Sequence, residues 1–203
     1  MVITGQPSAV EVIEPFTKGV IAKALIPLGT DVGKASLMKL TGNTMILGMV
    51  EVVAEALVFA EKSGLSPKNL DIFIQQMFPH SPFVAYSTRM LSGEYCPVPP
   101  KRPGYQVDLA RKDCKHALDL AKDCGARLEV VEVMDRHLKT AKEIGGDNMD
   151  IRYIASYRML TLVPHMEHSE RKLVSGFQIQ SSRAFNYIQN YYFASSQITP
   201  PWK

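Results

Sequence analysis

The stretch Thr30–Ser63, TDVGKASLMKLTGNTMILGMVEVVAEALVFAEKS, decides the fold of this 203-residue chain. It contains no proline, and apolar residues occupy nearly every face of a helix between Met38 and Ala60. At about 1.5 Å per residue, such a helix is roughly 50 Å long. A helix that is apolar nearly all round is surrounded by other helices or shared with a second subunit. The stretch therefore predicts one long central core helix.

Residues typical of helix boundaries lie at both ends of this stretch. Thr30 or Asp31 can cap the first backbone N–H groups, and Gly64 can take the conformation that ends a helix. The most apolar charge-free run, Leu40–Val50, stops at Glu51, well short of the roughly 20 residues that cross a bilayer. We therefore expect a buried helix and no membrane partner.

Two glycines lie inside this predicted helix. Gly42 and Gly48 each cost helix stability relative to alanine. We expect them where another backbone or a ligand approaches the helix closely.

Four shorter helices are predicted after the long one. Turns rich in proline or glycine, such as CPVPPKRPG and GGDNMD, separate them. The helices are expected at residues 66–77, 81–90, 107–124 and 128–144. The pattern decays beyond about residue 160, and residues 161–203 are expected to form an irregular tail. The fold class is therefore mainly α, a helical bundle around one long helix.

The first 28 residues read as strand, helix and strand. MVIT is the first strand, a helix follows from about Ser8 to Val20 with a break at Pro15, and IAKALIPL is the second apolar run. A pair of strands is not stable alone. This βαβ unit therefore docks on the rest of the chain or is the remnant of a larger sheet.

Composition excludes several classes of protein. The apolar fraction of 46% and charged fraction of 21% are typical of a folded, soluble body. The 23 basic residues, which exceed the acidic ones by three, are scattered between acids, so no nucleic-acid partner is expected. His165 and His168 have a metal-compatible spacing without a third ligand, so we interpret them as surface residues and expect no metal site.

The cysteines and the first residues of the chain indicate the cellular compartment. Cys96, Cys114 and Cys124 are an odd number without a CxxC spacing, which is typical of reduced thiols in a cytosolic protein. No charged segment followed by an apolar run opens the chain, so no secretory signal is expected. We expect a cytoplasmic protein, or a mitochondrial one if a targeting segment has been lost.

The order of motifs resembles the β-hydroxyacid dehydrogenase family, whose members include 3-hydroxyisobutyrate dehydrogenases and tartronate semialdehyde reductases. The matching motifs are glycines before a long helix, a K-x-x-x-N pattern, a Glu-Ala pair before a Gly-Leu turn, an aromatic residue seven positions before a Lys-Asp pair, and a glycine-rich closing turn. In this sequence they are Gly29 and Gly33, Lys39 and Asn43, Glu55-Ala56 and Gly64-Leu65, Tyr105 with Lys112-Asp113, and Gly146–Asp150. Two matches are imperfect: Tyr105 stands where phenylalanine is usual, and the closing turn has one residue extra.

The resemblance implies a domain organisation. Residues 1–28 look like the end of an NAD(P)-binding Rossmann domain, and residues 29–160 look like the helical domain that 6-phosphogluconate dehydrogenases share. The family's G-x-G-x-x-G turn, its residue that selects NAD or NADP and its substrate loop would all precede Met1. The sequence does not distinguish NAD from NADP as the cofactor. It also does not identify the particular hydroxyacid.

Hydride transfer at a hydroxyl carbon needs a group that takes the hydroxyl proton, and the resemblance gives this role to Lys39. A lysine within an apolar helix is costly to keep charged, which suits a base. The alternative is a lysine that extends from the edge of the core into solvent.

The resemblance assigns roles to the remaining residues as well. Asn43 lies one turn after Lys39 on the same face and would bind the substrate, or would bond a neighbouring backbone carbonyl instead. Lys112 would reach the nicotinamide end of the cofactor and Asp113 would help to orient it, unless the two form a solvated ion pair. Tyr105 would pack near the nicotinamide, or would be an ordinary loop aromatic.

Two functions follow from these expectations. The first is an NAD(P)-dependent oxidoreductase that converts a small 3-hydroxy acid to the semialdehyde or ketone, or the reverse, as a homodimer through the long helix. The second is a truncated, catalytically silent helical dimerisation module. The Lys39 motif favours the first, and the absence of a G-x-G-x-x-G turn favours the second.

Overall fold

The computed structural model describes residues 1–92, 103–145 and 150–151. Its elements are β1 (Val2–Ile3), α1 (Pro7–Thr17), β2 (Ile26–Pro27), α2 (Gly33–Lys62), α3 (Pro67–Met77), α4 (Pro82–Ser92), α5 (Val107–Cys124) and α6 (Glu129–Gly145). The expectation of a mainly helical chain with a small βαβ unit is confirmed. The predicted tail, residues 161–203, lies outside the described residues, as do Cys96, His165 and His168.

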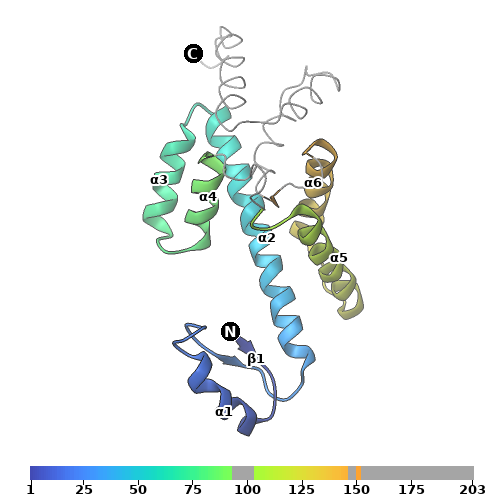
Figure 1. Cartoon of the computed structure of the whole chain (residues 1–203). Helices are drawn as coiled ribbons and strands as arrows, with labels where there is room; N and C mark the ends of the chain where they lie inside the picture. Colours follow the sequence, from blue (N-terminus) through green and yellow to red (C-terminus); the bar gives the residue numbers. More distant parts are fainter. Residues whose placement is uncertain (93–102, 146–149, 152–203) are drawn as a thin grey trace.

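The long helix is the axis of the molecule. Helices α3 and α4 lie along one side of α2, and α5 and α6 lie along the other (Figure 1). At its start, the Asp31 carboxylate accepts a hydrogen bond of 2.9 Å from the backbone N–H of Gly33. At its end, Gly64 has a φ of +81°, a conformation that glycine adopts without steric cost. The four shorter helices begin and end within two residues of their predicted bounds.

The hydrophobic core surrounds only the second part of α2. No side chain of residues 33–46 is buried, whereas the helix contributes eight buried residues from Leu47 onward. The core side chains come from α2, α4, α5, α6 and the segment at residue 151: Leu47, Val50, Val53, Ala54, Leu57, Met90, Val107, Ala110, Cys114, Val131, Met134, Leu138, Ala141 and Ile151. Within the described residues, other helices of the chain therefore enclose only the second part of α2, and contact of the first part with a second subunit stays a prediction. We call residues 33–46 the open half of α2 and residues 47–62 the core half.

By length and composition alone, α2 could cross a membrane. Its polar side chains, however, have partners within the protein. Glu51 is buried, and its carboxylate lies 2.8 Å from Nδ1 of His137 on α6. Because the apolar residues of the core half pack against α4, α5 and α6, we interpret α2 as the core helix of a folded domain.

The βαβ unit lies beside the amino end of α2 (Figure 1). Its two strands are parallel, and Val2 pairs with Ile26. The second strand covers only the later part of the predicted run at 21–28, and beyond it the backbone N–H of Leu28 still donates to the carbonyl of Ile3 at 2.9 Å. Helix α1 ends at Thr17 rather than Val20, and Pro15 lies inside the helix instead of breaking it.

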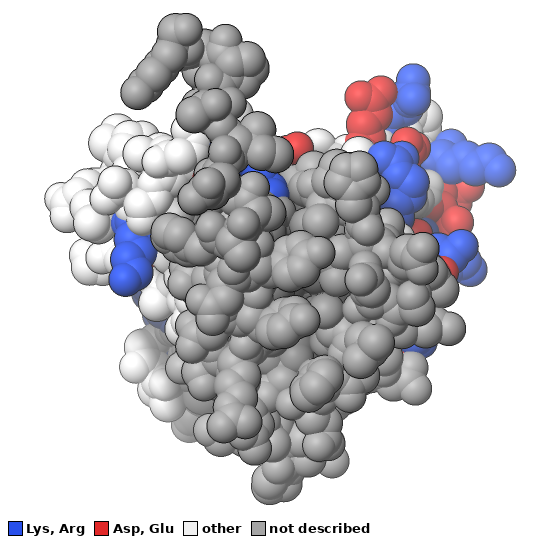
Figure 2. Space-filling view, turned by 90° about the horizontal axis from the view of Figure 1, so that it is seen from above, with Lys and Arg blue, Asp and Glu red and all other residues white. Residues whose placement is uncertain are grey.

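The two helix pairs differ in the charge of their surfaces. Figure 2 shows charged side chains of both signs over α5 and α6, whereas the surface over α3 and α4 is mostly uncharged. Because positive and negative groups are interleaved on α5 and α6, this side of the molecule has no continuous basic stripe among its described residues.

Candidate functional site

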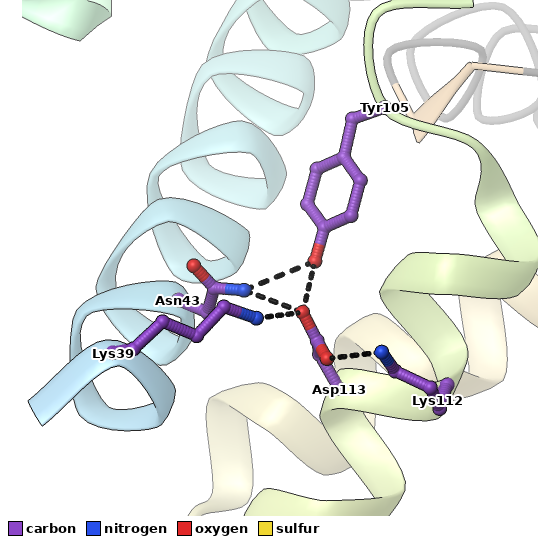
Figure 3. A network of polar contacts seen from close by, with 5 residues as sticks. All are labelled: Lys39, Asn43, Tyr105, Lys112 and Asp113. Atoms are coloured by element: carbon purple, nitrogen blue, oxygen red, sulfur yellow. Dashed lines mark hydrogen bonds and ion pairs between the residues drawn. The ribbon is translucent and has the colours of Figure 1, made fainter. Parts of the chain in front are cut away.

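The open half of α2 faces the first turns of α5, and a polar cluster joins the two helices. Lys39 and Asn43 project from α2, Lys112 and Asp113 from α5, and Tyr105 from the segment just before α5 (Figure 3). Residues separated by more than 60 positions in the chain therefore meet. The structure brings together all five residues that the sequence singled out.

Asp113 is the centre of this cluster. Its Oδ2 accepts hydrogen bonds from Nζ of Lys39 at 2.8 Å, from Oη of Tyr105 at 2.9 Å and from the Asn43 amide nitrogen. Its Oδ1 lies 3.3 Å from Nζ of Lys112. Because the Asp113 side chain is buried, these donors replace the water that a carboxylate normally binds.

The contacts fix the charge state of the carboxylate. Burial alone would raise the pKa of Asp113, but the hydrogen bonds from Lys39, Tyr105, Lys112 and Asn43 hold that pKa well below its usual range. Burial, together with the hydrogen bond to Asp113 and its negative charge, raises the pKa of Tyr105. Near neutral pH the cluster therefore contains an ionised carboxylate and a protonated phenol.

The two lysines of the cluster are accessible to solvent. The side chain of Lys39 is 59% exposed, and that of Lys112 is 55% exposed. Within the described part of the chain, apolar side chains therefore do not enclose Lys39. Lys39 combines an ion pair to a buried carboxylate with an accessible ammonium group.

The backbone around Tyr105 is held by residues at the end of the described chain. Its N–H donates to Oδ2 of Asp150 at 3.1 Å, and its carbonyl accepts from the N–H of Ile151 at 3.0 Å. Asp150 is completely buried. Sequence reasoning assigned Asp150 only to a closing turn and missed this contact. Residues 146–149 of that turn lie outside the described residues.

Two of these residues have partners that bear on the alternatives. The Asn43 amide nitrogen donates to Asp113 and Tyr105. Asp113 and Lys112 do form an ion pair, in which the carboxylate is buried and the lysine side chain is 55% exposed. A Cβ atom added at Gly42 would have no neighbour within 4 Å, whereas one at Gly48 would lie 3.3 Å from Cγ1 of Val130. The close neighbour at Gly48 is a side chain, so neither glycine shows the expected approach of another backbone among the described residues.

The arrangement suits proton transfer and the binding of a polar ligand. It offers two accessible ammonium groups and an amide on one open surface, with an ionised carboxylate beneath them. Among the described residues no cluster of three or more histidine, cysteine or acidic side chains could hold a metal ion. The sequence has no G-x-G-x-x-G turn of the kind that holds the pyrophosphate of a dinucleotide.

Comparison with known proteins gives consistent results. Residues 33–158 match the family described as the NAD-binding domain of NADP-dependent 3-hydroxyisobutyrate dehydrogenase. The chain is 33% identical over 153 residues to the NADH-dependent oxidoreductase ucdB of Aspergillus ustus, an alignment that covers 75% of this chain and 50% of that protein. The chain spans about half the length of the curated relatives it matches.

Solved structures show the same fold. The 3-hydroxyisobutyrate dehydrogenase of Salmonella typhimurium superimposes with a TM-score of 0.65 at 18% identity, over 75% of this chain and 52% of that one. Psf3 in complex with NADP+ and 2-OPP superimposes with a TM-score of 0.60 at 17% identity, over 76% of this chain and 52% of that one. At these identities the likeness concerns the fold.

Proposed function

This chain belongs to the NADP-dependent 3-hydroxyisobutyrate dehydrogenase family, whose cofactor is NAD or NADP, and on that premise we propose that it serves an oxidoreductase acting on a small 3-hydroxy acid. The reaction would convert the hydroxyl group to a semialdehyde or ketone, or reverse that step. The observation that supports it most is the buried Asp113 carboxylate, which ties Lys39 and Asn43 to one open surface.

Lys39 is the proposed general acid and base. In the oxidative direction a neutral Lys39 takes the proton of the substrate hydroxyl, and in the reductive direction its ammonium group returns a proton to the carbonyl oxygen. The Asp113 carboxylate, 2.8 Å from Nζ, stabilises the ammonium form that the oxidative step produces. The bound NAD or NADP supplies the acceptor or donor of the hydride.

The other residues of the cluster are proposed to bind and orient. Asn43 lies one helical turn from Lys39 and contacts the substrate. Lys112 is accessible and contacts the nicotinamide end of the cofactor, and Asp113 holds its ammonium group in place. The two cations and the amide fit a polar ligand that lies across α2 and α5.

We propose that the βαβ unit is the end of an NAD(P)-binding Rossmann domain and that the helical bundle is the second domain. Two parallel strands joined through a helix are the repeating unit of such a domain. Several large apolar residues of this unit are exposed, including Phe16, Val20 and Ile21, as they would be where further elements cover them. The reaction then requires a dinucleotide-binding unit that the described residues do not form.

We also propose a homodimer through α2. Exposed apolar side chains recur at every seventh position along the helix, at Met38, Met45, Val52 and Phe59. Met45 is 70% exposed and Phe59 is 73% exposed. A period of seven keeps one face of a helix toward a partner helix, and a second copy supplies the same stripe. The assembly would act in the cytoplasm.

Sedimentation analysis tests the dimer. The chain should sediment as a dimer, and Phe59→Glu should dissociate it because the substitution places a charge in the stripe. Asp119→Glu, an exposed position on α5, is the control that should leave the dimer intact. A wild-type chain that is monomeric at micromolar concentration would refute the interface.

The catalytic proposal is tested in a chimera that joins this chain, from residue 33 onward, to the first half of the Aspergillus ustus oxidoreductase. With NADH or NADPH it should transfer hydride to or from a panel of small 3-hydroxy acids such as 3-hydroxyisobutyrate. Lys39→Met should lower kcat by about 10²–10⁴-fold, the usual contribution of an acid-base group. Lys34→Met, an exposed lysine on the same helix, is the matched control.

The silent dimerisation module is the second candidate. Both candidates predict that the chain alone oxidises no 3-hydroxyisobutyrate, so turnover by the pure chain would overturn that shared expectation. The chimera separates them. A folded, dimeric chimera that transfers no hydride to or from any of the substrates would support the silent module and contradict the proposed dehydrogenase function.

A further inference from the structure

The position of Tyr105 in the cluster suggests a role that differs from contact with a cofactor. Its hydroxyl lies between two partners: it donates to Oδ2 of Asp113 at 2.9 Å and accepts from Nδ2 of Asn43 at 3.3 Å. The ring reaches the cluster from a backbone that Asp150 and Ile151 hold in place. The Tyr105 hydroxyl therefore donates one hydrogen bond and accepts another within the cluster.

These contacts determine which way the Asn43 amide points. A carboxylate cannot donate a hydrogen bond, so the atom of Asn43 that faces Asp113 must be the nitrogen. The second N–H of the same nitrogen is directed at the Tyr105 hydroxyl. Figure 3 shows the amide nitrogen turned toward Tyr105 and Asp113 and the amide oxygen turned away from both.

We propose that Tyr105 is a positioning residue whose hydroxyl fixes the Asn43 amide and the Asp113 carboxylate, so that Asn43 presents its oxygen to the ligand. This inference rests on the proposed function. The group of the ligand that faces Asn43 must then be a hydrogen-bond donor. An ionised carboxylate cannot occupy that place, because it has no proton to donate.

The first test measures the contacts themselves by NMR on the chain as it stands. In Tyr105→Phe, which keeps the ring and removes only the hydroxyl, the carboxyl carbon of Asp113 should titrate with its midpoint at a higher pH. Hydrogen exchange of the Asn43 side-chain amide should accelerate about fivefold, as expected for the loss of one neutral hydrogen bond worth about 1 kcal/mol. Thr41→Val, which removes a hydroxyl bonded to the Leu37 carbonyl, is the control that should change neither signal.

The second test separates positioning from cofactor contact. In the chimera, Tyr105→Phe should raise the KM for the hydroxy acid and lower kcat while leaving the KM for NADH or NADPH unchanged. A rise in the cofactor KM alone would show that the ring serves the cofactor and would overturn the inference. The inference would also be overturned if the Asp113 titration and the Asn43 amide exchange rate were the same in Tyr105→Phe as in the wild type.

The two proposals fail in different ways. If the NMR signals respond as expected but the chimera transfers no hydride, the contacts of Tyr105 are established and the dehydrogenase function is what fails. If hydride transfer proceeds and Tyr105→Phe is indistinguishable from the parent in both tests, the function stands and the positioning role is wrong.

Discussion

The core half of α2 is more apolar than the open half, and the two halves have different surroundings. In the core half, Leu47 is completely buried among side chains of α4, α5 and α6. In the open half, Leu37 is 48% exposed, and the side chains with defined partners across the molecule are Lys39 and Asn43. One helix therefore supplies the core at one end and the candidate site at the other.

The difference shows where stability and function separate in this chain. Apolar burial around the core half provides the favourable free energy of folding and fixes the direction of α2. The open half projects beyond the bundle and can offer Lys39 and Asn43 to a ligand. The polar cluster at Asp113 ties the open half to α5, so that cluster is where the two roles meet.

The largest expected effect comes from the core half. Leu47→Ala should lower the free energy of unfolding by about 2–5 kcal/mol, because it leaves a cavity in a closely packed core. Leu37→Ala, the same substitution ten residues earlier, should change it by less than about 0.5 kcal/mol. Urea denaturation followed by circular dichroism measures both. Equal losses for the two variants would mean that the halves do not differ in packing.

The next effect concerns the cluster that joins the halves. Asp113→Asn should lower the free energy of unfolding at neutral pH by about 1–3 kcal/mol, since it replaces a buried carboxylate by a weaker acceptor for its donors. Because the pKa of Asp113 is lower in the folded chain than in the unfolded one, its stabilisation is present above the unfolded pKa of about 3.9. It is lost as the pH falls toward the folded pKa.

This acid sensitivity has a matched control. Asp113→Asn should flatten the decline of stability between about pH 4 and the folded pKa, as measured by urea denaturation at several pH values. Asp108→Asn, on the exposed side of the same helix, removes an ion pair to Lys142 of 2.7 Å and should cost no more than about 1 kcal/mol. An unchanged acid decline in Asp113→Asn would show that other carboxylates cause it.

The smallest effect compares two glycines of α2. Gly42→Ala should stabilise the chain by about 0.5–1 kcal/mol, because the helix gains propensity and the new Cβ atom meets nothing within 4 Å. Gly48→Ala should gain less, since its Cβ atom would lie 3.3 Å from Val130. Thermal unfolding of the two variants provides the comparison. A larger gain at Gly48 would contradict the packing of α2 against α6.

Sequence reasoning located the helices well because their boundaries depend on local signals. Gly64 ended α2 where predicted, and the helix at 107–124 was predicted at its observed bounds. The surroundings of α2 were harder to predict, since both halves contain apolar residues and burial depends on where α5 and α6 lie. The contact between Asp113 and Lys39 joins residues 74 positions apart, so no local pattern contains it.

Tyr105 illustrates the same limit at one residue. Its distance in sequence from Lys112 and Asp113 identified it as a candidate, but its backbone N–H is bound by Asp150, 45 positions later. That dependence is tertiary, and a single sequence carries no signal for it. The residue types of the site could be predicted, whereas their hydrogen bonds could not.

Lysine acetylation footprinting of the chimera tests most directly whether the open half of α2 is the ligand-binding surface. Saturating NADH or NADPH together with 3-hydroxyisobutyrate should protect Lys39 and Lys112 from acetylation, while Lys34 and Lys115 stay as reactive as in the free protein. Mass spectrometry of the labelled peptides gives each rate separately. If Lys39 is acetylated at the same rate with and without saturating ligands, the candidate site is not where the ligands bind.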